Sequence, residues 1–252
     1  MRLLLDLGNT RLKWWLPGAV DAMNRDAISW DDDIATGLRA AWAPHDAPTE
    51  VWAASVVDAA RERVVEEVLA ARWGIAPNWV RTPADGCGVR NAYAEPHRLG
   101  IDRFLAMVAA HADGVGACVL VGVGTALTLD ALTDDGHHLG GLIAPGPQLM
   151  QQSLLGATAR VRPERPGRVV DAADNTADAV ASGCWQAAAA LVERFVAHMS
   201  PALGANAVVR IGGGDGESLK SLLALPVELV ADGVLHGLDV WANAQSGVGR
   251  AS

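Results

Sequence analysis

The chain has 252 residues, half of them apolar, and a formal net charge of −9. This length suits one or two domains with a sizeable core, and no apolar stretch is long enough to cross a membrane. The acidic net charge argues against wholesale nucleic-acid binding, and no signal peptide is expected. The three cysteines, Cys87, Cys118 and Cys184, are scattered and lack metal-ligand spacing, so a reducing, cytoplasmic setting is predicted.

The first fifteen residues predict a strand, a tight turn and a returning strand. The apolar run 3–5 is typical of a buried strand, Gly8-Asn9-Thr10 supplies turn chemistry, and residues 11–15 alternate polar and apolar side chains. Asp6 ends the buried strand, where a carboxylate is costly unless it meets a cation or hydrogen-bond donors. Two interpretations stay open on these residues: a phosphate-binding turn whose acid holds Mg²⁺ through water, or an ordinary hairpin with a capping Asp.

The rest of the first half predicts alternating strands and helices. Asp31-Asp32-Asp33 is interpreted as a solvated turn or helix N-terminus rather than a metal site. The elements expected next are a strand at 50–57, a helix capped by Asp58 that ends near Trp73, and a short strand at 79–81. Residues 82–98 form a loop long enough to carry function. A helix then begins near Gly100, with Asp102 and Arg103 in its first turn.

The second half repeats the opening pattern. Aligned without a gap, Gly124 falls on Gly8, and the strand 126–130 falls on residues 10–14. A turn at 134–136 leads into another strand at 139–144, and His137 and His138 near its tip are expected to face solvent. A third glycine turn, at 211–215, follows a strand and precedes a helix.

Between these turns lie two helices and a basic loop. A helix is expected from Pro147 to about Gly156. The arginine-rich stretch 160–168 is interpreted as a solvated loop, with a phosphate-attracting rim as the alternative. A long helix from Thr176 to about Met199 is apolar around much of its circumference, so it is buried in the core or against a partner, and we take it as a dimer-interface candidate.

Three segments are predicted. Residues 1–114 form an N-terminal domain with the first glycine turn and the loop 82–98. Residues 115–245 form a C-terminal domain with the second and third glycine turns and the helix taken as a dimer-interface candidate, and residues 246–252 form a disordered tail.

The duplicated hairpin turns and the late glycine turn resemble the acetate and sugar kinase/Hsp70/actin superfamily. Within it, the chain resembles type III pantothenate kinases over nearly its whole length. The motifs that carry this resemblance, in family order, are Asp6-x-Gly8-Asn9-Thr10, Asn91-x-Tyr93-x-x-Pro96-x-x-Leu99-Gly100-Ile101-Asp102-Arg103, Gly124-Thr125-Ala126-x-Thr128-x-Asp130, Gly140-Gly141-x-Ile143-x-Pro145-Gly146 and Asn175-Thr176.

The resemblance implies an α/β fold of two duplicated ribonuclease-H-like domains with an interdomain ATP cleft. It implies phosphorylation of pantothenate to 4′-phosphopantothenate by ATP with Mg²⁺, the first step of coenzyme A synthesis, in a cytoplasmic homodimer. Another small-molecule kinase of the superfamily and a transcriptional accessory factor of the same family remain as alternatives.

The resemblance also implies roles for individual residues. Asp102 is implied as the base that accepts the pantothenate hydroxyl proton, although on its position alone it more simply satisfies backbone N–H groups at a helix start. Arg103 is implied to meet the substrate carboxylate, with an exposed salt bridge to Asp102 as its alternative. The implied ATP contacts are Asp6, Leu7, Gly8, Asn9, Thr10, Arg11, Leu12, Lys13 and Thr125. The implied substrate contacts are Tyr93, Gly100, Ile101, Asp102, Arg103 and Thr176.

One position departs from the family pattern. Type III enzymes commonly carry an aspartate two residues before the second glycine turn, where it helps bind K⁺ or NH₄⁺. This chain has Gly122 there, aligned with Asp6 in the internal repeat. Because glycine offers no side-chain oxygen, we expect a weak dependence on K⁺ or a different mode of binding it.

Overall fold

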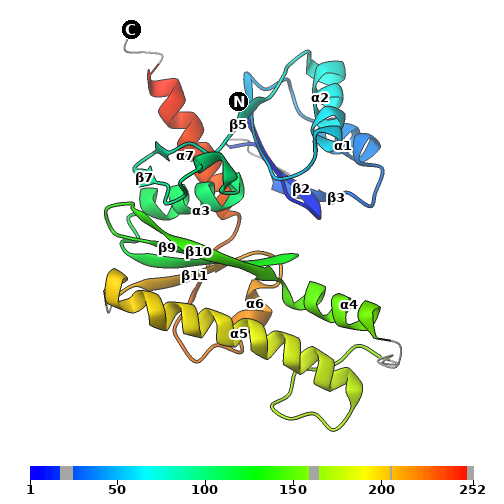
Figure 1. The fold of residues 1–252 in the computed structure, drawn as a ribbon. Coiled ribbons are helices and arrows are strands. Elements are labelled where there is room, and N and C mark those ends of the chain that lie inside the picture. Colours follow the sequence, from blue (N-terminus) through cyan, green and yellow to red (C-terminus); the bar gives the residue numbers. More distant parts are fainter. Residues whose placement is uncertain (18–24, 159–164, 205, 249–252) are drawn as a thin grey trace. The chain divides into compact units, whose positions relative to one another are not determined.

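The computed structural model describes residues 1–17, 25–158, 165–204 and 206–248. The chain divides into two compact units, the first comprising residues 1–113 together with the segment from Gly233 onward, and the second residues 114–232 (Figure 1). The predicted limit at 245 is therefore corrected, because the last helix, α7 (Gly233–Val248), packs against α3 (Ile101–Ala112) of the first unit. That helix also includes residues 246–248 of the predicted tail, and residues 249–252 lie outside the described part.

A five-stranded sheet forms the centre of the first unit, in the order β3-β2-β1-β4-β5. Its strands are β1 (Arg2–Leu7), β2 (Arg11–Trp15), β3 (Arg25–Ser29), β4 (Glu50–Ser55) and β5 (Asn78–Val80). The first three pair antiparallel, whereas β4 and β5 continue parallel to β1. β3 lies in the stretch for which the sequence predicts no element.

Helices cover both faces of this sheet, which explains why β1 is apolar without alternation. Leu3, Leu5 and Leu7 pack in one core with side chains of α1 (Ile34–Trp42) and α2 (Ala59–Trp73). α3 and α7 contact the sheet as well. Asp33 caps α1 by accepting the Thr36 N–H, and Asp58 caps α2 by accepting the N–H groups of Ala60 and Arg61. The predicted cap at Asp58 is confirmed, and of the two interpretations of residues 31–33 the helix N-terminus is confirmed.

The predicted loop 82–98 contains short elements of its own. They are the hairpin strands β6 (Asp85–Gly86) and β7 (Val89–Arg90), and a 3₁₀ turn, η1 (Pro96–Arg98). The Thr82 hydroxyl donates to the Leu99 carbonyl over 2.7 Å and ties the two ends of the segment together. The segment is therefore ordered by local pairing and not only by its neighbours.

The second unit also has a five-stranded sheet, in the order β10-β9-β8-β11-β12. Its strands are β8 (Cys118–Val123), β9 (Ala126–Leu132), β10 (His138–Pro145), β11 (Val208–Gly212) and β12 (Glu228–Leu229). As in the first unit, the first three strands pair antiparallel and the last two run parallel to the central one. The helices are α4 (Pro147–Ala157), α5 (Thr176–Leu203) and α6 (Gly216–Lys220).

The register corrects the gapless alignment of the two hairpins. Leu7 pairs with Leu12 across residues 8–11, whereas Val123 pairs with Leu127 across residues 124–126. The second turn is thus one residue shorter, and Ala126 takes the place of Arg11 rather than of Thr10. The preceding strands keep their alignment, so Gly122 still corresponds to Asp6.

The long helix α5 uses its apolar face inside its own unit. Trp185, Val192 and Phe195 are buried in one core with the inward-facing residues of β8 and β9. Internal packing therefore accounts for much of the apolar circumference that the sequence assigned to a core or a partner.

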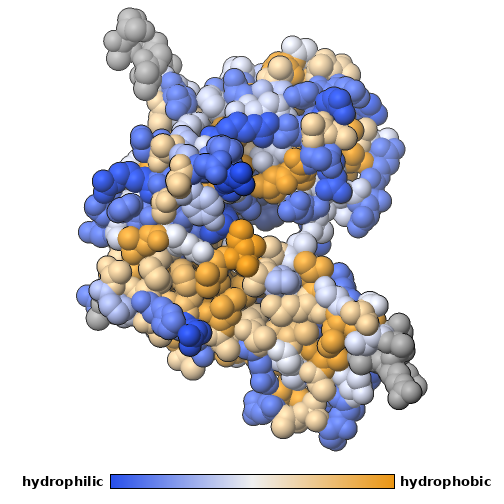
Figure 2. All heavy atoms as spheres, in the orientation of Figure 1, coloured by the Kyte–Doolittle hydropathy of each residue, from blue (hydrophilic) through white to orange (hydrophobic). Residues whose placement is uncertain are grey.

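Figure 2 shows hydrophobic surface on the second unit, where Leu142 and Ile143 of β10 and Leu154 of α4 are exposed. No described helix combines the length and the apolar character needed to cross a membrane.

Candidate functional site

The first glycine turn lies between β1 and β2. The Gly8 N–H donates to the Arg11 carbonyl over 3.1 Å, and a side chain at Gly8 would press on that same oxygen. Asn9 and Thr10 are exposed, and Asp6 is partly buried opposite Lys13 on the neighbouring strand. Leu7 and Leu12 are fully buried in the core, so only their backbone remains for the predicted contact with ATP.

The second turn leaves Thr125 exposed and is supported by backbone from two other segments. The Thr125 carbonyl accepts the Gly146 N–H, at the start of α4, over 2.8 Å. The Val123 carbonyl accepts the Asp215 N–H of the third glycine turn over 3.3 Å. Gly213 has a positive φ of 99° and leaves no room for a Cβ against Val123. Two turns far apart in sequence thus meet at one end of the second sheet.

The predicted substrate residues of the first unit gather at the start of α3. Arg103 is buried, and its Nη1 donates to the Tyr93 hydroxyl over 3.1 Å. The alternative of an exposed arginine is therefore wrong. The Asp102 carboxylate accepts the Arg103 N–H over 2.9 Å, and a side chain at Gly100 would collide with that carboxylate. Ile101 is nearly fully buried, which leaves its backbone for any ligand contact.

Asn91 braces this segment, a role that the sequence analysis did not assign. Its Oδ1 accepts the Tyr93 N–H over 3.0 Å, and its Nδ2 donates to the carbonyls of Pro83 and Pro96 over 3.2 and 3.1 Å. One amide side chain thereby connects both ends of the segment to the residue that carries the phenol. The available signal was its place two residues before Tyr93 in the motif.

Thr176, the remaining predicted substrate residue, begins α5 and lines an open hollow of about 520 Å³ in the second unit. The hollow is lined by Leu154, Ala173, Asp174, Asn175, Thr176, Ala179 and Val180. The side chain of Asn175 caps α5 by accepting the Asp178 N–H.

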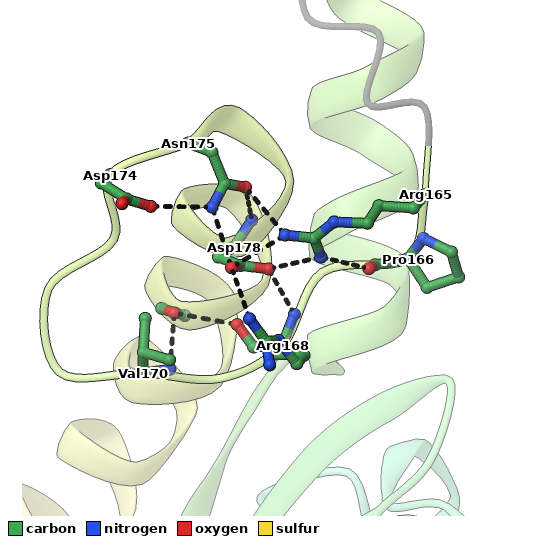
Figure 3. A network of polar contacts seen from close by, with 8 residues as sticks. Arg165, Pro166, Arg168, Val170, Asp174, Asn175 and Asp178 are labelled. Carbon is green, nitrogen blue, oxygen red and sulfur yellow. Dashed lines mark hydrogen bonds and ion pairs between the residues drawn. The ribbon is translucent and has the colours of Figure 1, made fainter.

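Asp178 is the centre of a polar network around this helix start (Figure 3). Its carboxylate accepts two bonds from the Arg165 guanidinium, over 2.8 and 3.0 Å, one from the Arg168 N–H and one from the Asn175 amide. The Arg165 guanidinium, followed by the Arg168 N–H and Asn175, holds the pKa of Asp178 far below its ordinary value. Arg165 therefore ties its end of the predicted basic loop to the start of α5. Residues 160–164 of that loop lie outside the described residues.

The second sheet contains His138, which was expected to face solvent, and Gly122, the position that departs from the family pattern. His138 is fully buried beside Asp130, with Nε2 and Oδ1 2.8 Å apart, so the expectation that it faces solvent is wrong, whereas His137 is exposed. Gly122 pairs with Thr128 and Gly212, and a side chain at 122 would meet the Thr128 hydroxyl. Among the described residues, no group of three or more His, Cys, Asp or Glu side chains is arranged to hold a metal ion.

Comparisons with known proteins agree with the motifs. Residues 2–198 match the family described as type III pantothenate kinase. The chain is 38% identical to the type III pantothenate kinase of Aromatoleum aromaticum, over 96% of this chain and 98% of that protein.

Among solved structures, the fold is similar to a candidate 2-dehydro-3-deoxygalactonokinase from Sinorhizobium meliloti, with a TM-score of 0.64 at 14% identity, over 97% of this chain and 96% of that one. It is also similar to a conserved candidate transcriptional activator of the Baf family from Campylobacter jejuni, with a TM-score of 0.61 at 17% identity, over 97% and 99% of the two chains. At these identities the likeness shows the fold alone.

Proposed function

The chain belongs to the type III pantothenate kinase family, and on that basis we propose that it phosphorylates pantothenate with ATP, giving 4′-phosphopantothenate for coenzyme A synthesis. The observation that carries the proposal is the family match along residues 2–198. The strand order common to both units supports the finer view that they are duplicated ribonuclease-H-like domains.

The proposed phosphate contacts are the exposed residues of the two turns. In phosphoryl transfer the protein mainly positions the reactants and neutralises the γ-phosphate. Backbone N–H groups of the first turn and the exposed Thr125 of the second are suited to this task. The proposed adenosine contact is the third glycine turn, which touches the second one.

Asp6 is the proposed carboxylate near Mg²⁺. A single acid fits this ion, because Mg²⁺ keeps several water ligands and takes others from the nucleotide phosphates rather than from a dedicated protein cage. When bound with ATP, Mg²⁺ supplies charge neutralisation at the phosphates. Asp6 would hold it through water, while the partly buried strand end keeps the carboxylate in place.

Asp102 is the proposed general base. Its carboxylate lies in the first turn of α3, where the helix dipole favours the ionised form that accepts a proton. The buried Arg103 guanidinium and the Tyr93 hydroxyl bonded to it form a polar pair suited to the pantothenate carboxylate. Thr176 in the hollow of the second unit is a further proposed contact.

The decisive test is ADP release that depends on added pantothenate. Asp102→Asn should lower turnover about 100-fold or more without unfolding the protein, because it removes a proton acceptor but keeps the shape. Asp46→Asn, a change of an exposed carboxylate in the same unit, is the matched control and should leave turnover unchanged. Near-normal turnover in folded Asp102→Asn would contradict the assignment.

The alternative functions gain no support from the described residues. The structural similarities to a kinase and to a transcriptional activator concern the fold only. The net charge of −9 also disfavours a nucleic-acid partner. A screen of alternative hydroxyl substrates and a gel-shift assay with a salt titration would reveal either activity.

A homodimer is proposed as the assembly. β10 is an edge strand, and Leu142 and Ile143 on it are exposed, 42% and 64% respectively, which is unfavourable unless another surface covers them. Sedimentation at micromolar concentration should show a dimer, and Ile143→Glu should shift it towards monomer. A wild-type monomer would contradict the proposal.

The proposed location is the cytoplasm. The free state of Cys87, Cys118 and Cys184 supports it, because a reducing compartment keeps thiols unpaired.

A further inference from the structure

The carbonyl groups of the first glycine turn are bonded to side chains and backbone of two distant segments. The Trp30 indole Nε1 donates to the Gly8 carbonyl over 2.7 Å, and the Trp30 N–H donates to the Thr10 carbonyl over 3.2 Å. The carbonyl between them, that of Asn9, accepts a bond from Arg61 Nη1 over 3.2 Å. Three consecutive carbonyls are thus held from outside the turn.

This arrangement determines where the turn's N–H groups point. Each peptide group is planar and trans, so its N–H points opposite to its carbonyl. When Trp30 holds the Gly8 carbonyl, the Asn9 N–H points away from Trp30; when Arg61 holds the Asn9 carbonyl, the Thr10 N–H points away from Arg61. Consecutive N–H groups directed to one side are what a bound phosphate requires.

Trp30 and Arg61 are also fixed to each other and to the fold. The Arg61 guanidinium lies 5.0 Å from the centroid of the Trp30 ring, a cation–π contact. Trp30 follows β3 and packs against the core of the first unit. Arg61 lies in the first turn of α2, where its own N–H donates to the Asp58 cap over 3.0 Å. The pair therefore connects the turn to two rigid elements.

We propose that Trp30 and Arg61 are positioning residues for ATP, which act by orienting the backbone N–H groups of Asn9 and Thr10 towards the phosphates. The inference rests on the proposed function, since it takes this turn as a phosphate contact. Neither residue belongs to the motifs that indicated the family.

Three substitutions test the contacts of Trp30 and Arg61 with the turn one at a time. Trp30→Phe keeps an aromatic ring for packing but removes the Nε1 donor. Arg61→Gln removes the charge and the stacked guanidinium, and Arg61→Lys keeps the charge without the planar fork. The matched control is Arg72→Gln, because Arg72 likewise lies 5.1 Å from a tryptophan ring, that of Trp73, and donates to the loop carbonyls of Ala43 and His45, at the other end of α2.

The measurements are the KM for each substrate, the melting temperature, and Mg·ATP affinity by calorimetry without pantothenate. Trp30→Phe and Arg61→Gln should each raise the KM for ATP and weaken Mg·ATP binding about fivefold to tenfold, as expected for one lost hydrogen bond of this kind. The KM for pantothenate should change less than about twofold, since the turn is proposed to contact ATP alone. Arg61→Lys should be intermediate, and Arg72→Gln should match the wild type in every substrate constant.

Several results would overturn the proposal. An unchanged KM for ATP in both variants would do so, as would an equal rise in Arg72→Gln or in the KM for pantothenate, which would indicate general destabilisation. An effect of Arg61→Gln alone, with Trp30→Phe at wild-type values, would mean that the charge acts directly and not through the turn. If the wild type showed no pantothenate-dependent ADP release, the proposed function would fail, whereas Mg·ATP binding would still test the positioning role.

Discussion

The first and second glycine turns follow β1 and β8, the central strands of two sheets with the same strand order, but other parts of the chain support the two turns in different ways. In the first unit, Trp30 and Arg61 reach across from β3 and α2 to hold the turn's carbonyls. In the second unit, the shorter turn is held by the backbone N–H groups of Gly146 and Asp215, and a Cβ added at Gly146 or Gly213 would collide with the backbone of that turn. Side-chain support can lose one hydrogen bond while the fold remains, whereas at Gly146 and Gly213 an added Cβ has no space to occupy.

The largest effect is therefore expected from Gly213→Ala. The change places a Cβ against the Val123 backbone at a φ of 99°, so the unfolding free energy should fall by about 3 kcal/mol, with loss of ATP binding. Gly140→Ala is the control, since its φ is 112° but nothing lies within 4 Å of the added Cβ. Urea unfolding of both variants would measure the difference. Equal costs would show that backbone strain alone matters and would remove the contrast between the turns.

The next effect concerns the acid that precedes only one of the two turns. Asp6→Asn keeps the shape but removes an anion, so the Mg²⁺ concentration for half-maximal turnover should rise about fivefold to tenfold at fixed ATP. Turnover titrated with Mg²⁺ measures this shift. Asp32→Asn, which changes an exposed carboxylate, should leave the curve in place. A curve for Asp6→Asn that coincides with the wild type would end the metal assignment.

A smaller effect is expected at Gly122, the counterpart of Asp6. Wild-type turnover should change less than about threefold when K⁺ replaces Na⁺ at constant ionic strength, because glycine supplies no side-chain oxygen. Gly122→Asp should increase the response to K⁺. Because a side chain at 122 meets the Thr128 hydroxyl, Gly122→Asp with Thr128→Ala is the variant with room for the carboxylate, and Thr128→Ala alone is its control. A large, saturable K⁺ activation of the wild type would contradict the prediction.

The smallest effect concerns the carboxylates near two helix starts. The Arg165 guanidinium lowers the pKa of Asp178, and backbone N–H bonds lower that of Asp58. Because the pKa of each carboxylate is lower in the folded state, the ionised carboxylate stabilises the fold at pH values above its ordinary, unfolded-state pKa. This contribution is lost as the pH falls from the ordinary pKa through the lower pKa of the folded state. Asp178→Asn should therefore flatten the loss of melting temperature between about pH 5 and pH 2. Arg165→Gln should flatten it in part, and an unchanged profile in both would contradict this role for the network.

Local patterns determined much of this protein. The hairpins, the capping aspartates and the start of α3 follow from short-range preferences, since a glycine turn, an N-cap or a periodic apolar face needs only its neighbours in sequence. The candidate site residues Asp6, Asp102, Tyr93 and Thr125 were likewise found from motifs. Their proposed roles depend on the family resemblance, because a first-turn aspartate alone is more simply a helix-start carboxylate.

Only the tertiary structure decided which distant residues meet. The burial of His138 against Asp130, the addition of α7 to the first unit and the contact of Trp30 and Arg61 with the glycine turn leave no periodic signal in the sequence. The length of the second turn was also undetermined, because a hairpin that is shorter by one residue has the same alternation and differs only in cross-strand register. These features depend on contacts between segments tens of residues apart, which form only when the sheets and helices pack.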